Sequence, residues 1–182
     1  YKGLPAPIIC DYLSREQSQK VYGDDYQVQI GKIEMVTNTG TYLDSPFHFD
    51  AQGNDLADLA LDMLADLPAI VVEASDQIEV GVEFFRDLDV AGKALLVKTN
   101  WSKHWNTEQY FENHPYLTEE AALFLVEQGA KLVGIDSHNI DNTNGKLRPV
   151  HKHLLGNNVL ICEHMTNLGQ LPLSQCVAFF IR

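Results

Sequence analysis

Short apolar runs, separated by polar and turn-forming residues, recur along the chain and predict strands. The runs 69–73 and 94–98 are largely aliphatic and β-branched, which is typical of strands that are buried on both faces. The run 132–135 has the same character. Two further strands are expected at 159–162 and 176–181. The pattern therefore predicts a sheet that contains several buried strands.

A different pattern, in which apolar and polar residues alternate, precedes these runs. Tyr26, Val28 and Ile30 alternate with polar residues, as in a strand that is buried on one face. The segment 33–36 either continues this strand or pairs with it. Residues 1–10 are rich in proline, so we expect them to be extended or irregular.

Helix signals are few but specific. Ser14 and Gln17 have the spacing of a capping box, and the helix that they predict ends near Gly23. Thr118 caps a second helix, which has acidic residues in its first turn and ends at Gly129. Shorter helical segments are expected within 55–65, 82–87 and 149–156. The order of elements, with many strands, few helices and long loops, predicts an α/β fold with a mixed sheet.

Length and composition fit an ordinary globular domain. A chain of 182 residues is long enough to bury roughly 70% of its unfolded surface. We see no repeat, linker or low-complexity segment, so a single domain over residues 1–182 is the simplest prediction. The net charge of −12, without a basic cluster, disfavours a nucleic-acid partner. No apolar run approaches the roughly 20 residues that span a bilayer, so we expect no membrane partner.

The cysteines predict a reducing compartment. Cys10, Cys162 and Cys176 are widely spaced and odd in number, so they suggest no disulfide framework. Cys10 and Cys176 lie among apolar residues, and we expect them to be buried thiols. The cytoplasm is the location that this usage favours.

The segment 38–48 (Asn-Thr-Gly-Thr-Tyr-Leu-Asp-Ser-Pro-Phe-His) gathers more varied polar side chains than any other stretch. Gly40 and Pro46 impose sharp local geometry, so these side chains could converge on one point. Asp44 and His48 are suitable ligands for Zn²⁺ or Mn²⁺. The competing interpretation is that Asp44 caps a turn and His48 is a surface histidine.

His151 and Glu163 form a second candidate pair. His151 lies on the short helix that Pro149 opens, and Glu163 ends the apolar run 159–162. A carboxylate at the end of a buried strand needs a partner or solvent, because a lone buried charge is costly. The alternative is a salt-bridge partner at a strand end and a histidine on a helix surface.

Other polar and aromatic residues could line a pocket. Asp136 and His138 follow the end of a strand, where site residues of α/β sheets are common, although turn chemistry competes with this interpretation. Trp101 begins an aromatic cluster that could form the wall of a substrate pocket or simply pack. We expect His153 and His164 to be structural or to support the site from behind, and His164 to face away from its neighbour in the strand.

The segment 38–48 resembles the signature of the cyclase family, His-x-Gly-Thr-His-x-Asp-x-Pro-x-His, a family that includes bacterial kynurenine formamidase and isatin hydrolase. The matching positions are Gly40, Thr41, Asp44, Pro46 and His48. Further matches, in the order of the family, are Gly134-Ile135-Asp136, Arg148-Pro149-Val150-His151 and Glu163-His164-Met165-Thr166-Asn167-Leu168. The resemblance implies a swivelling β/β/α fold, a homo-oligomer (dimer or tetramer) and metal-dependent hydrolysis of an amide or cyclic amide. The usual first strand of the family is expected to be missing.

By position, the resemblance makes Asp44, His151 and Glu163 ligands of a divalent metal ion, Zn²⁺ or Mn²⁺, and gives His48 a role in proton transfer. Asn38 and Tyr42 replace two ligand histidines of the signature. Asparagine offers only a neutral oxygen, and tyrosine must lose a proton with a pKa of about 10 before it binds strongly. These two residues either belong to a rebuilt ion site or contact a substrate.

Two functions follow from these residues. The first is a metal-dependent amide hydrolase that resembles arylformamidases and acts on a small molecule. The second is a small-molecule-binding protein, or an enzyme without the family's metal, on the same scaffold. The sequence contains no GxSxG, P-loop or dinucleotide-binding motif, so nucleophilic serine catalysis has no support.

Overall fold

The computed structural model describes residues 3–173 and 176–179 and, within the last strand, the side chain of Phe179 only. The chain forms two compact units, Tyr1–Gly40 and Thr41–Arg182. The single domain that the sequence predicts stays a prediction. In the described part of the chain, no helix is long and apolar enough to cross a membrane.

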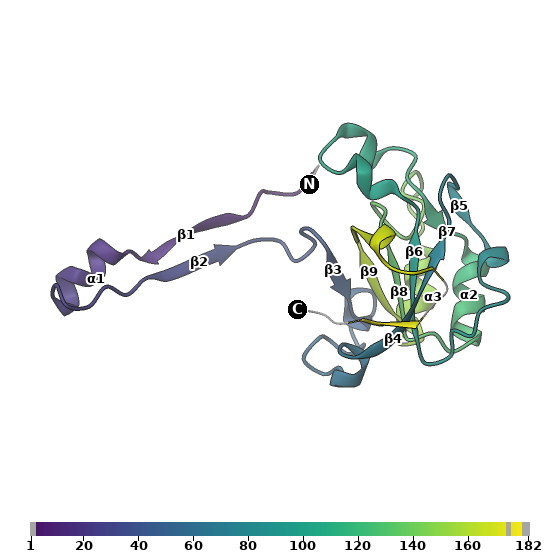
Figure 1. Ribbon diagram of the computed structural model, residues 1–182, viewed down its shortest axis with the longest axis horizontal. Helices are drawn as coiled ribbons and strands as arrows, with labels where there is room; N and C mark the ends of the chain where they lie inside the picture. The colour runs from purple at the N-terminus through teal and green to yellow at the C-terminus, as the bar shows by residue number, and fades with distance from the viewer. Residues whose placement is uncertain (1–2, 174–175, 180–182) are drawn as a thin grey trace. The chain divides into compact units, whose positions relative to one another are not determined.

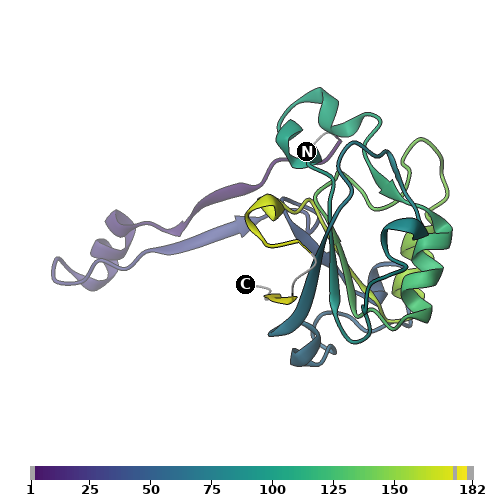
Figure 2. The ribbon, with the colours of Figure 1, turned by 45° about the vertical axis from the view of Figure 1, so that its right-hand side comes forward.

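The N-terminal unit is a two-stranded antiparallel hairpin with a helix in its connection. Its elements are β1 (Ile8–Leu13), α1 (Arg15–Tyr22) and β2 (Ile30–Glu34), and Figures 1 and 2 show the two strands side by side. The predicted capping box is confirmed: Ser14 Oγ accepts from the backbone of Gln17, whose side chain accepts from the backbone N–H of Ser14. The helix ends at Gly23, which has a positive φ of 82°.

Nearly all of this hairpin is exposed, which the sequence did not predict. Ile9 and Tyr12 on β1 are 76% and 74% exposed. The expected half-buried strand at 26–30 begins only at Ile30 and is exposed, and Cys10 is an exposed free thiol rather than a buried one. Both predictions assumed a core beneath the strands, but a hairpin of two strands has no second layer of its own. Cys176 lies where no side chain is described.

The C-terminal unit is built on a six-stranded mixed sheet in the order β10-β4-β6-β8-β9-β3. Its strands are β3 (Tyr42–Asp44), β4 (Leu67–Glu73), β6 (Ala94–Lys98), β8 (Leu132–Ile135), β9 (Leu160–Glu163) and β10 (Cys176–Phe179). The four central strands are parallel, whereas β3 and β10 run antiparallel at the two edges. A small parallel pair is formed by β5 (Glu79–Val80) and β7 (Tyr116–Leu117). The prediction of an α/β fold with a mixed sheet is confirmed.

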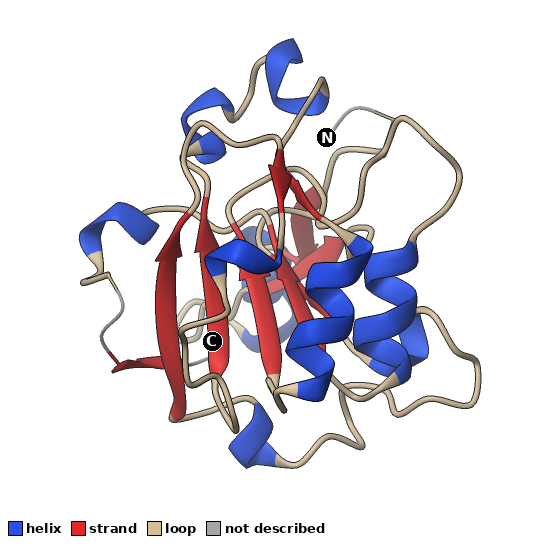
Figure 3. Ribbon diagram, turned by 90° about the vertical axis from the view of Figure 1, so that its right-hand side faces the viewer, coloured by secondary structure: helices blue, strands red, loops and turns tan. Residues whose placement is uncertain are grey.

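Helices α2 (Glu119–Glu127) and α3 (Pro149–Gly156) lie side by side over one face of the sheet (Figures 1 and 3). Short 3₁₀ turns lie at Pro46–His48, Leu61–Met63, Val82–Phe84, Trp101–His104, Glu108–Phe111 and Leu168–Gln170. The strands alternate between two apolar clusters, as a pleated sheet requires. On β4, Ile70 and Val72 pack on the side of the helices, and Ala69 and Val71 pack on the opposite side.

The pairing of the edge strand β3 with β9 brings polar residues together beneath α3. Tyr42 is paired with Glu163, and Asp44 with Ile161. Residues opposite each other in an antiparallel pair share a face. Ile161 packs in the cluster beneath the helices, so Tyr42, Asp44 and Glu163 face α3 as well. This edge of the sheet therefore holds the polar residues that the sequence singles out.

Candidate metal centre

A tight loop after β3 fixes the first part of the site. Ser45 is extended, and Pro46 then opens a 3₁₀ turn that ends at His48. The loop is closed by a hydrogen bond from the backbone N–H of Phe47 to the carbonyl oxygen of Asn54. A Cβ added at Gly53 would lie 2.7 Å from the carbonyl carbon of Pro46, so only glycine allows this approach. The loop thus sets Asp44 and His48 on one side of the site.

Asp44, His48 and His151 form the cluster that could hold an ion. One donor atom from each lies within 4.8 Å of the other two. The distances are 3.5 Å from His48 Nδ1 to Asp44 Oδ1 and 3.8 Å from His151 Nε2 to Asp44 Oδ2. Asp44 and His151 are buried, whereas the side chain of His48 is 43% exposed. The cluster is therefore enclosed on the protein side and open through His48.

Asp141, which the sequence analysis missed, orients His151. Its Oδ2 lies 2.6 Å from His151 Nδ1, and both carboxylate oxygens accept from backbone N–H groups at the start of α3, those of Val150 and His151. A histidine that donates one ring N–H to a carboxylate presents its other nitrogen for binding, as metal-bound histidines generally do. His151 Nε2 accordingly faces Asp44 and Glu163.

Glu163 is fully buried and tied on both oxygens. Its Oε1 accepts from the backbone N–H of Ile140 at 2.7 Å and lies 3.5 Å from His151 Nε2. Its Oε2 accepts from the Tyr42 hydroxyl at 2.5 Å and from Asn139 Nδ2 at 3.3 Å. The predicted ligand Glu163 thus contacts the cluster through Oε1, and its other oxygen accepts from Tyr42.

The charges of the site fit a divalent cation. Three carboxylates, Asp44, Asp141 and Glu163, are buried, and their ion-pair partners in the described part of the chain are histidines. Burial lowers the pKa of His151, but Asp141, Asp44 and Glu163 together raise it to about 9. Burial raises the pKa of Glu163, an effect that His151 and Tyr42 oppose.

A further observation comes from Asp44 Oδ2, which is buried and has no hydrogen-bond donor. An acceptor in this position is costly unless a cation or proton meets it. Carboxylate oxygens and imidazole nitrogens are the donors that Zn²⁺ and Mn²⁺ take in proteins. The residues present therefore fit a metal ion.

Asp136 and Trp101, two further predicted site residues of the C-terminal unit, are not members of this cluster. Asp136 is buried and accepts from the backbone N–H groups of Thr99 and Asn100, so it fixes the turn after β6. Trp101 donates from Nε1 to the carbonyl oxygen of Tyr110. Asn38 belongs to the N-terminal unit, where its side-chain oxygen accepts from Thr37.

His138 belongs to a separate group of rings. Its ring centroid lies 5.0 Å from that of His114 and 5.6 Å from that of His164. Burial, with the charge of neighbouring histidines, lowers the pKa of His138 to about 4 and that of His164 to about 3, so both rings are neutral. Strand alternation does not apply to His164, because β9 ends at Glu163 and His164 has a φ of 56°.

The ring of His164 lies 5.3 Å from the ring of Tyr42 and accepts or donates at Nδ1 toward the hydroxyl of Tyr110. It therefore supports the site from behind. His153 pairs with Glu119 at 2.8 Å and links α3 to α2. The positions of His153 and His164 agree with the structural or supporting roles expected of them.

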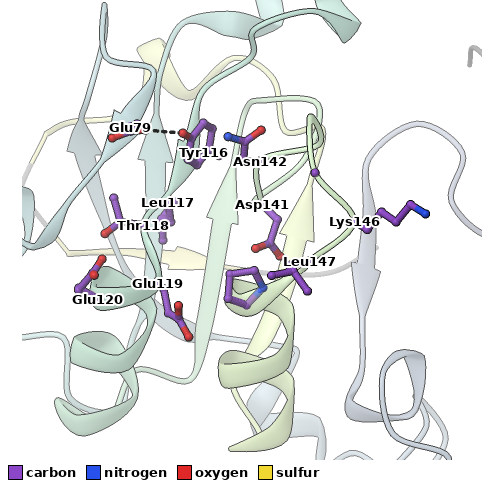
Figure 4. Close-up of a pocket in the computed structure, with 12 residues that line it drawn as sticks. Glu79, Tyr116, Leu117, Thr118, Glu119, Glu120, Asp141, Asn142, Lys146 and Leu147 are labelled. Atoms are coloured by element: carbon purple, nitrogen blue, oxygen red, sulfur yellow. Dashed lines mark hydrogen bonds between the residues drawn. The ribbon is translucent and has the colours of Figure 1, made fainter.

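Two surface pockets include polar residues discussed above. The larger, of about 600 Å³, lies at the starts of α2 and α3 and is lined in part by Glu79, Tyr116, Glu120 and Asp141 (Figure 4). A smaller pocket of about 420 Å³ includes Asp136 in its lining. Asp141 thus separates the larger pocket from His151.

The sequence matches the cyclase family model ("Putative cyclase") over residues 7–142. It is 32% identical over 139 residues to kynurenine formamidase of Bacillus cytotoxicus, covering 76% of this chain and 65% of that protein. Kynurenine formamidase of Geobacillus thermodenitrificans is 33% identical over 157 residues, covering 80% and 73%. The chain thus spans just under two thirds of the length of the Bacillus relative.

Solved structures share the fold at lower identity. Isatin hydrolase A from Labrenzia aggregata, bound to benzyl benzoate, superposes with a TM-score of 0.77 at 20% identity, covering 96% of this chain and 76% of that one. A protein described as a potential metal-dependent hydrolase with cyclase activity gives a TM-score of 0.73 at 22% identity, covering 96% and 81%. The fold, the site and the match over residues 7–142 lead to one conclusion: this chain belongs to the cyclase family.

Proposed function

We propose that this protein is a metal-dependent hydrolase of an amide or cyclic amide, similar to arylformamidases. The observation that carries the proposal is the buried, donor-free Asp44 Oδ2 facing the oriented nitrogen of His151. The similarity to kynurenine formamidases supports a small-molecule substrate with an amide carbonyl. Zn²⁺ and Mn²⁺ are the ions that the donor atoms favour.

Asp44, His151 and Glu163 would hold the ion, each through one atom that the fold already points at the cluster. A divalent ion supplies Lewis-acid polarisation of the substrate carbonyl and a nucleophile at neutral pH. Asp141 keeps the proton of His151 on Nδ1, so that Nε2 stays available. Burial of these residues keeps bulk water away from the charged atoms.

His48 would move the proton. Its ring is partly exposed, and its Nδ1 is 3.5 Å from Asp44 Oδ1, which can stabilise the imidazolium. The histidine takes a proton from the attacking water and delivers it to the leaving nitrogen, as a general acid–base residue does. Its exposure allows exchange of the proton with solvent.

Metal analysis and turnover test this function together. The purified protein should take up about one equivalent of Zn²⁺ or Mn²⁺ and hydrolyse N-formylkynurenine or a related aryl amide. His48→Gln should lower kcat by about 100-fold or more, and its effect on ion uptake shows whether the ring also holds the ion, as its place in the cluster allows. His153→Gln, at the surface pair with Glu119, is the matched control and should leave both unchanged. A protein saturated with metal that turns over no amide would contradict the hydrolase function.

A second function has its own support in Asn38 and Tyr42. Tyr42 donates a hydrogen bond to Glu163, and asparagine is a weak ion ligand, so the scaffold also suits a binding protein that needs no metal. In that case the unmodified protein would take up no Zn²⁺ or Mn²⁺, and the double variant Asn38→His/Tyr42→His would create uptake. Tight metal binding by the unmodified protein would remove the reason for this alternative.

We further propose a homo-oligomer, either a dimer or a tetramer, in which the hairpin of the N-terminal unit contacts a second copy of this chain. Ile9 and Ile33 are paired across the two strands and are 76% and 66% exposed. A two-stranded hairpin is marginally stable in water without further packing. The free thiols of Cys10 and Cys162 are in line with the cytoplasmic location that we also propose.

Light scattering after gel filtration measures this assembly. The double variant Ile9→Glu/Ile33→Glu should shift the protein to the monomer mass. Lys32→Glu, at the neighbouring position of β2, is the control and should keep the oligomer. A wild-type protein that is monomeric at all concentrations would contradict the proposal.

A further inference from the structure

Tyr42 occupies a position where the family signature has a histidine, and its hydroxyl reaches another residue of the site. It lies on β3 opposite Glu163 on β9, so the two side chains share the face beneath α3. The hydroxyl donates to Glu163 Oε2 at 2.5 Å. Residues 121 positions apart in sequence are thereby joined at the centre of the site.

The two carboxylate oxygens of Glu163 have different partners and therefore different roles. Oε2 is held by Tyr42 and Asn139. Oε1 accepts from Ile140 and is the oxygen that lies near His151 Nε2. The carboxylate therefore cannot rotate without losing hydrogen bonds at a position with no access to water. One oxygen is fixed as an anchor, and the other is presented to the cluster.

The ring of Tyr42 is itself held in place. It lies against the ring of His164, and Thr41, its neighbour in the chain, donates from Oγ1 to the carbonyl oxygen of His164 at 2.7 Å. His164 in turn pairs with the hydroxyl of Tyr110 at 2.9 Å. These contacts fix the phenol ring of Tyr42 without an ion, so ion binding does not have to order this side chain.

We propose that Tyr42 is a positioning residue for the ion, which acts through Glu163 and binds no metal itself. This inference rests on the proposed function. In this chain a tyrosine that orients another ligand replaces a ligand histidine of the family signature. Tyr42 holds Glu163 Oε2, so that Glu163 would bind the ion through Oε1 alone. Hydrogen-bonded supports of this kind contribute about 10–100-fold to metal affinity.

The test measures metal affinity by competition with a chromophoric chelator, using Zn²⁺ and Co²⁺. Tyr42→Phe should weaken binding about 10–100-fold and change the visible absorption of bound Co²⁺, because Glu163 is released. Tyr116→Phe is the matched control, since Tyr116 donates an equivalent hydrogen bond to Glu79 in the pocket of Figure 4. That control should leave affinity and spectrum unchanged. Circular dichroism checks that each variant is folded.

A double-mutant cycle separates positioning from direct binding. If Tyr42 acts only through Glu163, Tyr42→Phe should cause no further loss of affinity in a Glu163→Gln background. Should Glu163→Gln fail to fold, Glu163→Asp takes its place in the cycle. Independent, multiplying losses would overturn the inference, as would a phenolate-to-metal charge-transfer band when Cu²⁺ is bound.

The remaining outcomes distinguish this inference from the function on which it rests. A Tyr42→Phe variant that binds Zn²⁺ as tightly as the wild type, or more tightly, overturns the positioning role and leaves the hydrolase function standing. A wild-type protein that takes up neither Zn²⁺ nor Co²⁺ overturns both.

Discussion

The two units of this chain place the apolar residues of their strands in opposite environments. In the C-terminal unit, apolar runs become strands that are buried between two apolar clusters. In the N-terminal unit, Ile9, Tyr12 and Ile33 of the hairpin are exposed. The difference lies in what covers each sheet: α2 and α3 pack over the sheet of the larger unit, whereas α1 lies in the connection between the two strands of the hairpin. An apolar pattern therefore indicates that a strand needs a partner, but not that the same unit provides it.

Core and hairpin substitutions should differ most strongly. Leu95 on β6 is fully buried, so Leu95→Ala should lower the free energy of unfolding by about 2–5 kcal/mol. Ile9→Ala, at a site that is 76% exposed, should change it by less than about 0.5 kcal/mol when the protein is dilute. Urea denaturation at low concentration measures both. A comparable loss at Ile9 that grows with protein concentration would show that another copy covers the hairpin.

The pH dependence of the free energy of unfolding, measured without metal, shows how much the protonated His151 stabilises the C-terminal unit. The pKa of His151 is raised to about 9, above the value of about 6.5 in an unfolded chain. The proton on His151 therefore stabilises the fold fully below pH 6.5, and this stabilisation is lost as the pH rises through 9. Denaturation in a chelator should show a fall of up to about 3 kcal/mol between these values.

His151→Gln is the control for this pH effect. The variant has no imidazole to protonate, so its stability should change much less between pH 6.5 and 9. An equal fall in the variant would assign the effect to other groups and contradict the prediction.

Glycine substitutions in the two units give the smallest contrast. Gly53→Ala should cost about 1–3 kcal/mol and weaken ion binding, because the added Cβ would meet the backbone of Pro46 and displace the loop that carries His48. Gly31→Ala on β2 would meet only Gln29 Nε2, at 3.7 Å, and should be nearly neutral. Thermal unfolding with and without Zn²⁺ measures both variants. Equal effects at the two sites would mean that the loop adjusts freely.

The sequence predicted the interior of the C-terminal unit closely. The bounds of β6, β8 and α3 agree with the prediction, because aliphatic runs and an opening proline are local signals. The hairpin was less well predicted: residues 1–10 were expected to be extended or irregular without a defined strand, and β2 begins later than expected. A strand without a core beneath it has no periodic pattern that separates it from a loop.

Asp44, His48 and His151 lie close together, as the sequence led us to expect. The residues that orient the site were not identified from the sequence. Asp141 lies ten residues before His151, in a loop whose path no local pattern reveals. The bond between Tyr42 and Glu163 depends on the register of β3 against β9. A search for acidic residues shortly before the helix of His151 would have found Asp141. No comparable signal exists for a contact between residues 121 positions apart.

The shortness of β3 links the site to the integrity of the sheet. This edge strand has three residues, and two of them, Tyr42 and Asp44, face the candidate centre. An ion that joins Asp44 to His151 would therefore fasten the outermost strand to the body of the protein. We expect chelation to loosen β3 and raise amide exchange along it. The outer side of β9 would then be exposed as a template for pairing with another chain.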